Sequence, residues 1–182
     1  MSDYLNKNTD VKKAVGGDDL AAIAHFVNYG MKEGRQASSK FDVNSYRMRY
    51  KDLRSAFGYD LASYYYHYMS SGKAEGRQAT GKVTDIDGVT VYNGVDYAAV
   101  YNFNYYVDAN PDIKAAFGND DLAVLSHFVN YGMKEGRRGC EAFNVLTYRE
   151  KNGDLKAAFG DDLKQYYIHY MNYGKNEGRK AA

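Results

Sequence analysis

The chain has 182 residues, a formal net charge of +1, twenty tyrosines, no tryptophan and a single cysteine. Basic and acidic residues are interspersed, which argues against a nucleic-acid partner, because such partners need a strongly basic face. No run of about eighteen apolar residues is present, so we expect no insertion into a membrane. A single cysteine also excludes an internal disulfide, and we expect Cys140 to be an incidental exposed thiol.

Four related repeats make up the sequence, and each carries a histidine ten residues before the arginine of a Glu-Gly-Arg tripeptide. The histidines are spaced by 42, 60 and 42 residues, residues 25–35 are identical to residues 127–137, and the second repeat matches the fourth. This pattern indicates an A–B pair that was duplicated as a block. The signature residues are His25 and Arg35, His67 and Arg77, His127 and Arg137, and His169 and Arg179.

Repeats of this length bury their apolar faces only against neighbours, so we predict an all-α fold of tandem short helices packed as a compact array. The first pair spans residues 1–82, with repeats 1–40 and 41–82, and the second spans 101–182, with repeats 101–142 and 143–182. An insertion, 83–100, separates the pairs. Tyr4 corresponds to Tyr106 but lacks the lead-in that precedes Tyr106, which suggests that the sequence is an excerpt from a longer chain.

Glycines mark the expected helix ends in every repeat. A glycine follows the first amphipathic segment each time, and glycine favours the left-handed conformation that closes a helix. These stops are Gly16, Gly58, Gly118 and Gly160.

The insertion has the features of a β-hairpin. Between Val89 and Tyr97, the pair Asn93-Gly94 lies among β-favouring residues, which predicts a small hairpin or an extended clasp. Residues 85–88 resemble the start of a calcium loop, but the twelfth position is Asp96 instead of glutamate and the glycine is misplaced. We therefore expect no metal there.

The third repeat shows the helix signals most clearly. Asn110 caps a helix that has Pro111 at its first position. A second helix begins with Asp120 or Asp121 as its cap and carries apolar residues at spacings of three and four as far as Gly132. Residues 133–135 are expected to add one more turn.

The histidines and arginines of the signature are expected to be structural. One histidine per repeat cannot supply the three or four converging ligands of a metal site. We expect a half-buried imidazole among aromatic rings, hydrogen-bonded to a neighbouring repeat. Each arginine is expected to form a forked pair with an aspartate of a first helix and so to hold one repeat to the next. The expected partners are Asp10, Asp52, Asp112 and Asp154. A ligand-binding role for these arginines is the alternative.

No pattern of a catalytic site is present. The sequence lacks a nucleophile elbow, a phosphate-binding loop and a zinc-protease motif. The Asp-Asp pairs at 18–19, 120–121 and 161–162 follow helix-ending glycines, so capping explains them. We therefore expect a protein that is not an enzyme and has no cofactor.

The tyrosines are the main candidates for binding. Some positions are aromatic or apolar in all four repeats, which is typical of a packing layer. Others break the repeat, and an exposed tyrosine offers rigid amphipathic contact area to a protein or a sugar. The candidates are Tyr59, Tyr64 and Tyr66 in the second repeat, with Tyr92 and Tyr97 in the insertion. The alternative is that they only cover the next repeat.

The repeats resemble tandem helical modules of secreted and cell-surface proteins of gut Firmicutes, which often accompany lysozyme-like muramidase domains. The resemblance rests on residues 110–118, 127–137 and 92–97 and covers nearly the whole chain. It implies an extracellular or cell-wall-associated setting and a non-catalytic role. The first residues, Met1–Tyr4, contain no signal peptide.

These observations lead to competing hypotheses of function. In the first, the array is a recognition module that binds a host protein or a wall or mucus glycan through exposed Tyr and Arg side chains. An immunoglobulin-binding, superantigen-like module is one form of it. In the second, the array is a passive stalk or spacer.

Overall fold

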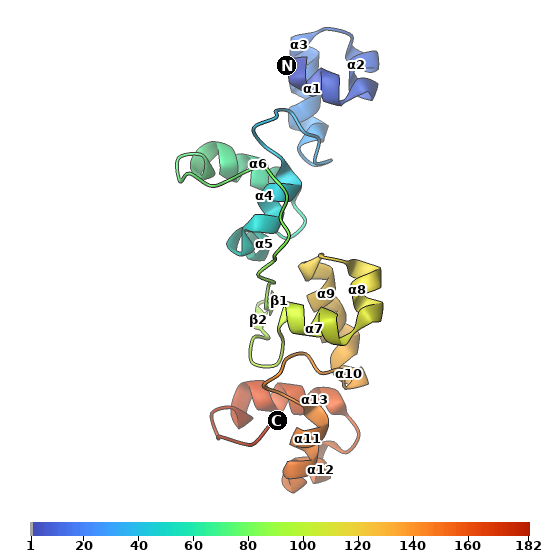
Figure 1. The fold of residues 1–182 in the computed structure, drawn as a ribbon, viewed down its shortest axis with the longest axis vertical. Helices are drawn as coiled ribbons and strands as arrows, with labels where there is room; N and C mark the ends of the chain where they lie inside the picture. The colour runs from blue at the N-terminus through green and yellow to red at the C-terminus, as the bar shows by residue number, and fades with distance from the viewer. Residues whose placement is uncertain (1) are drawn as a thin grey trace. The chain divides into compact units, whose positions relative to one another are not determined.

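A computed structural model describes residues 2–182. The chain forms two compact units, Met1–Ile86 and Asp87–Ala182, which we call the N-terminal and C-terminal units. Each unit consists of short helices, and the C-terminal unit adds one two-stranded antiparallel sheet (Figure 1). The predicted all-α fold with a small hairpin is therefore confirmed. Within residues 2–182, no helix combines the length and the apolar character that crossing a membrane requires.

The helices of the two units follow the same order. Those of the N-terminal unit are α1 (Ser2–Lys7), α2 (Thr9–Val15), α3 (Asp19–His25), η1 (Phe26–Gly30), α4 (Val43–Arg49), α5 (Lys51–Phe57), α6 (Leu61–His67) and η2 (Tyr68–Gly72). The C-terminal unit contains β1 (Val91–Tyr92), β2 (Val95–Asp96), α7 (Phe103–Ala109), α8 (Pro111–Phe117), α9 (Asp121–His127), η3 (Phe128–Gly132), α10 (Met133–Glu135), α11 (Val145–Lys151), α12 (Gly153–Phe159), α13 (Leu163–His169) and η4 (Tyr170–Gly174).

The helix ends follow the predicted glycine stops. The four glycines after α2, α5, α8 and α12 have φ between 55° and 64°, a backbone region that side chains with a Cβ rarely adopt. Asp18 and Asp120 cap the next helix by accepting backbone amides. Asn110 does not cap α8 as predicted, because its side chain donates to the Tyr106 carbonyl and accepts from Arg137. Asp162 makes no side-chain cap either.

The third helix of each repeat continues into a π-helix, a feature that the sequence analysis did not predict. This segment ends in a buried glycine. Beside the glycine, the hydroxyl of a buried tyrosine forms a hydrogen bond with the histidine of the same repeat. The four pairs are Tyr4–His25, Tyr46–His67, Tyr106–His127 and Tyr148–His169, with hydroxyl to Nδ1 distances of 2.8–3.1 Å. Each histidine is half-buried, but its partner belongs to the same repeat. The predicted bond to a neighbouring repeat is wrong.

Each signature arginine pairs with the predicted aspartate. Arg35 is forked onto Asp10, with nitrogen to oxygen distances of 2.8 and 2.9 Å. The other pairs are Arg77–Asp52, Arg137–Asp112 and Arg179–Asp154, at 2.8–2.9 Å. Every arginine also contacts the glutamate two residues before it. These pairs close one repeat upon itself, so the expectation that the arginine holds one repeat to the next is wrong.

A tyrosine and its ring contacts hold the two repeats of a pair together. In the N-terminal unit, Tyr65 donates its hydroxyl hydrogen bond to the Arg35 carbonyl at 2.9 Å and packs edge-on against Phe26. In the C-terminal unit, Tyr167 makes the same bond to the Arg137 carbonyl. Burial raises the pKa of the Tyr65 phenol far above its ordinary value, so the hydroxyl stays protonated and keeps donating.

The hairpin lies where the sequence places it. Val91 pairs with Asp96 and Tyr92 with Val95. Asn93 and Gly94 both have positive φ, 49° and 79°, as a two-residue type I′ turn requires. The sheet belongs to the C-terminal unit, together with the helices of the third and fourth repeats.

Candidate binding site

The tyrosines predicted to bind occupy different environments. Tyr59 and Tyr66 are exposed, at 57% and 53%. Tyr64 is fully buried and donates to the Gly58 carbonyl at 2.8 Å, so it belongs to the core and cannot contact a partner. Tyr92 and Tyr97 are half-buried and belong to the C-terminal unit, whereas Tyr59, Tyr64 and Tyr66 belong to the N-terminal unit.

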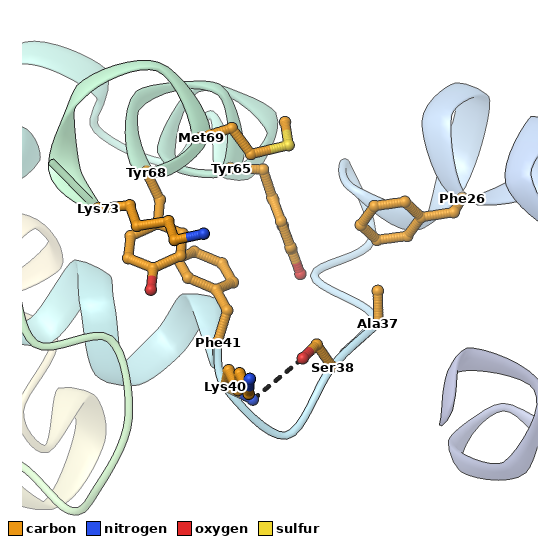
Figure 2. A pocket seen from close by; sticks show the side chains of 9 residues that line it. All are labelled: Phe26, Ala37, Ser38, Lys40, Phe41, Tyr65, Tyr68, Met69 and Lys73. Carbon is orange, nitrogen blue, oxygen red and sulfur yellow. Dashed lines mark hydrogen bonds between the residues drawn. The ribbon is translucent and has the colours of Figure 1, made fainter. Parts of the chain in front are cut away.

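A pocket in the N-terminal unit gathers aromatic side chains instead. It lies where the first repeat meets the second and has a volume of about 290 Å³. Figure 2 shows Phe26 and Ala37 on one side, Tyr68, Met69 and Phe41 on the other, and Tyr65 between them. The complete lining is Phe26, Ala37, Ser38, Lys40, Phe41, Tyr65, Tyr68, Met69 and Lys73.

The helical register of the second repeat forms this pocket. Tyr65 of α6 and Tyr68 of η2 are three residues apart and both pack against Phe41. Their ring centroids lie 4.9 and 4.6 Å from that of Phe41. Met69, the next residue, remains 59% exposed at the opening. None of the five predicted tyrosines is among the residues that line the pocket.

The pocket is apolar inside and positively charged at its edge. Lys40 and Lys73 are exposed, and its lining contains no carboxylate. The Tyr65 hydroxyl is already engaged with the Arg35 carbonyl. Few polar groups are therefore left to orient a sugar or a cofactor. A volume of about 290 Å³ is at the small end of ligand pockets, which run from roughly 300 to 1,000 Å³. It suits one or two apolar side chains with an acidic group nearby.

The corresponding part of the C-terminal unit is covered more fully. Phe128, the equivalent of Phe26, is 0% exposed, whereas Phe26 is half-buried. Tyr101 packs on the Phe128 ring at 5.0 Å, and Asn102 donates its amide to the Gly139 carbonyl at 2.9 Å. Polypeptide from the same chain thus covers positions that remain open in the N-terminal unit.

Cys140 takes part in this covering. Its side chain is buried, so the expectation of an exposed thiol is wrong. Its Sγ lies 3.9 Å from the Ala99 carbonyl oxygen, and burial raises the pKa of the thiol. Both effects make it a packing residue and a poor nucleophile.

The sequence analysis missed the residues that line the pocket. Of the four equivalent aromatic residues Phe26, Tyr68, Phe128 and Tyr170, only Phe128 is buried, and the other three are half-buried.

Among residues 2–182, no cluster of three or more His, Cys, Asp or Glu side chains is arranged to hold a metal ion. Comparisons with protein-family models, curated proteins and solved structures found no match for this chain.

Proposed function

We propose that the protein is a non-catalytic recognition module that binds a polypeptide partner through the aromatic pocket of its N-terminal unit. The supporting observation is the open pocket of Phe26, Tyr65 and Tyr68, whose counterpart in the C-terminal unit is covered by the chain's own backbone and an aromatic side chain. Buried aromatic anchors in such pockets carry most of the energy of protein interfaces.

The partner is expected to present an aromatic or aliphatic side chain beside an acidic group. The apolar lining favours the first, and Lys40 and Lys73 at the edge favour the second. Following the family resemblance, we propose an extracellular or cell-wall-associated setting, with immunoglobulin as the first partner to test.

Binding of the full chain to immunoglobulin, mucin and peptidoglycan would test this proposal. Met69→Glu puts a charge at the pocket opening without removing a buried residue, because Met69 is 59% exposed. It is expected to weaken binding at least tenfold. Lys73→Glu should weaken it less, and more at low salt than at high salt. Lys175→Glu, the equivalent change in the fourth repeat, is the matched control and should leave binding unchanged.

The outcomes separate the hypotheses. Protein binding that Met69→Glu abolishes supports the proposal. Binding to mucin or peptidoglycan sugars alone would favour a glycan-binding module. Binding to none of these, in the wild-type chain, would favour the passive spacer.

A further inference from the structure

The residues that lead into each repeat form a recurring contact. In three repeats an aromatic residue stands just before the first helix cap and packs on the first aromatic residue of the π-helix. The pairs are Phe41–Tyr68, Tyr101–Phe128 and Phe143–Tyr170, with centroids 4.6, 5.0 and 4.6 Å apart. The backbone amide of the following residue donates to a carbonyl just after the Glu-Gly-Arg of the same repeat, and we call this acceptor the tail residue. These bonds run from Asp42 to Ala79, Asn102 to Gly139 and Asn144 to Ala181, at 2.7–2.9 Å.

The first repeat contains the residues on which such a lead-in would pack. Phe26 and Ala37 hold the places of Phe128 and Gly139. Phe26 and Ala37 are only half-buried. An aromatic side chain followed by an amide donor would complete the contact.

The apolar face of α3, next to Phe26, is exposed as well. Leu20 is 78% exposed, and Ile23 and Val27 are each 44% exposed. In the C-terminal unit the equivalent residues of α9 and η3 are covered: Leu125 is 0% and Val129 is 5% exposed, and Leu122 is half-buried. Leu20, Ile23 and Val27 do not line the aromatic pocket, whereas Phe26 and Ala37 do, so this surface adjoins the proposed binding site at those two residues.

Residues 87–102 are anchored along that face of α9. The Val89 amide donates to the buried Asp121 carboxylate at 2.9 Å. One turn and two turns further along the helix, Ser126 and Asn130 donate to the Tyr92 hydroxyl, at 3.3 and 3.2 Å. Leu122 and Leu125 lie between these anchors. Val129 has additional cover from α13, whose Lys164 donates to its carbonyl.

We propose that the exposed face of α3, together with the open side of Phe26, is a docking surface for a polypeptide lead-in with the chemistry of residues 87–102. Such a segment is a hairpin that presents valine and tyrosine, followed by an aromatic residue and an amide donor. The first repeat keeps Asp19 and Asn28 in the places of Asp121 and Asn130, and has Ala24 in the place of Ser126.

The residue at position 37 selects the aromatic side chain. Beside Tyr101 the tail residue is Gly139, where a Cβ would overlap the Val100 carbonyl oxygen and the Phe128 ring. Beside the two phenylalanine lead-ins, Phe41 and Phe143, the tail residue is alanine. Ala37 therefore favours phenylalanine in the docked segment.

A graft onto the full chain would test the surface. A copy of residues 83–103 replaces Met1, which preserves the 102-residue register, and the copy carries Tyr101→Phe to suit Ala37. Amide hydrogen exchange in α3 and η1 is expected to slow at least tenfold relative to the ungrafted chain, with α5 and α6 unchanged. The control graft carries serine at its copies of Val89, Tyr92 and residue 101. Leu20→Glu in the grafted chain should abolish the slowing.

Three results would overturn the proposal. One is unchanged exchange in the grafted chain, and another is equal slowing by the serine control. The third is concentration-dependent self-association of the ungrafted chain that Leu20→Glu abolishes, because a second copy would then be the occupant. Met69→Glu changes the other side of the pocket that contains Phe26 and Ala37, so it should leave the effect of the graft on α3 intact. The graft is measured without a binding partner, so its failure is distinguishable from failure of the proposed function.

Discussion

Gly174→Ala is expected to destabilise the C-terminal unit, although alanine normally favours a helix. Gly174 ends η4 and is buried. A Cβ there would overlap the Tyr148 hydroxyl and lie 3.0 Å from its Cζ. Tyr148 would have to move away from His169, whose Nδ1 is 2.9 Å from that hydroxyl.

The magnitude follows from opposing terms. Replacing glycine by alanine within a helix gains about 0.5–1 kcal/mol. Overpacking a buried site costs roughly 1–3 kcal/mol, and loss of the Tyr148–His169 hydrogen bond costs about 0.5–1.5 kcal/mol. The net loss is therefore about 0.5–4 kcal/mol. Gly153→Ala, at the start of α12 with no atom near its added Cβ, is the matched control and is expected to stabilise the unit by up to about 1 kcal/mol.

Amide hydrogen exchange across α11 to η4 of the full chain would measure both changes, since about 1.4 kcal/mol corresponds to a tenfold change in the opening equilibrium. Tyr148→Phe removes the obstructing hydroxyl, so Gly174→Ala should cost at least about 1 kcal/mol less in that background. Equal effects of the two glycine substitutions would refute the argument. So would a cost of Gly174→Ala that is the same with and without the tyrosine hydroxyl.

Three further predictions concern the C-terminal unit. Arg137→Ala is expected to lower the urea midpoint at pH 7, because Arg137 pairs with the Asp112 carboxylate and holds its pKa below the usual 3.8. The part of the loss that comes from this pair should persist above pH 4 and disappear as the pH falls through the lowered Asp112 pKa. Burial lowers the pKa of His127 below its usual 6.5, so stability should be complete above pH 6.5 and decline toward pH 5; a histidine titration by NMR that gives a pKa of 6.5 or more would contradict this. Cys140 should react with a thiol reagent at pH 8 only as fast as the unit opens, and denaturant should accelerate the reaction.

Local rules were sufficient for the ends of elements. Gly118 and Asp120 lie where the glycine-stop and cap rules place them, because both depend on the backbone of a few neighbouring residues. The hairpin at Asn93-Gly94 follows from turn geometry in the same way. Asn110 shows the limit of these rules: two non-local partners, the Tyr106 carbonyl and Arg137, take its side chain away from the helix end.

Contacts between distant residues were harder to predict. In all four repeats the partner of the histidine is the tyrosine 21 residues before it, so this regular spacing was visible in the sequence. What was missing was the path of the chain, which folds the first helix of a repeat back onto its own third helix. Tyr64 was predicted to bind but is buried. Tyr64, Tyr65 and Tyr66 are consecutive, and only the side of α6 on which each lies decides that the first two are buried and Tyr66 is exposed.

The first and third repeats show that the signature motif does not determine which surfaces are open. Residues 25–35 and 127–137 have the same sequence, yet Val27 is 44% exposed and Val129 only 5%. The difference arises from residues outside the motif. Residues 87–102 cover α9, and Lys164 of α13 donates a hydrogen bond to the Val129 carbonyl. The residue equivalent to Lys164 in the second repeat is Ala62, which has no such donor. The motif residues make the contacts within each repeat, while the segments between repeats decide which aromatic and aliphatic surfaces are open. Binding in such an array would therefore change through its lead-ins and insertions, with the helices left as they are.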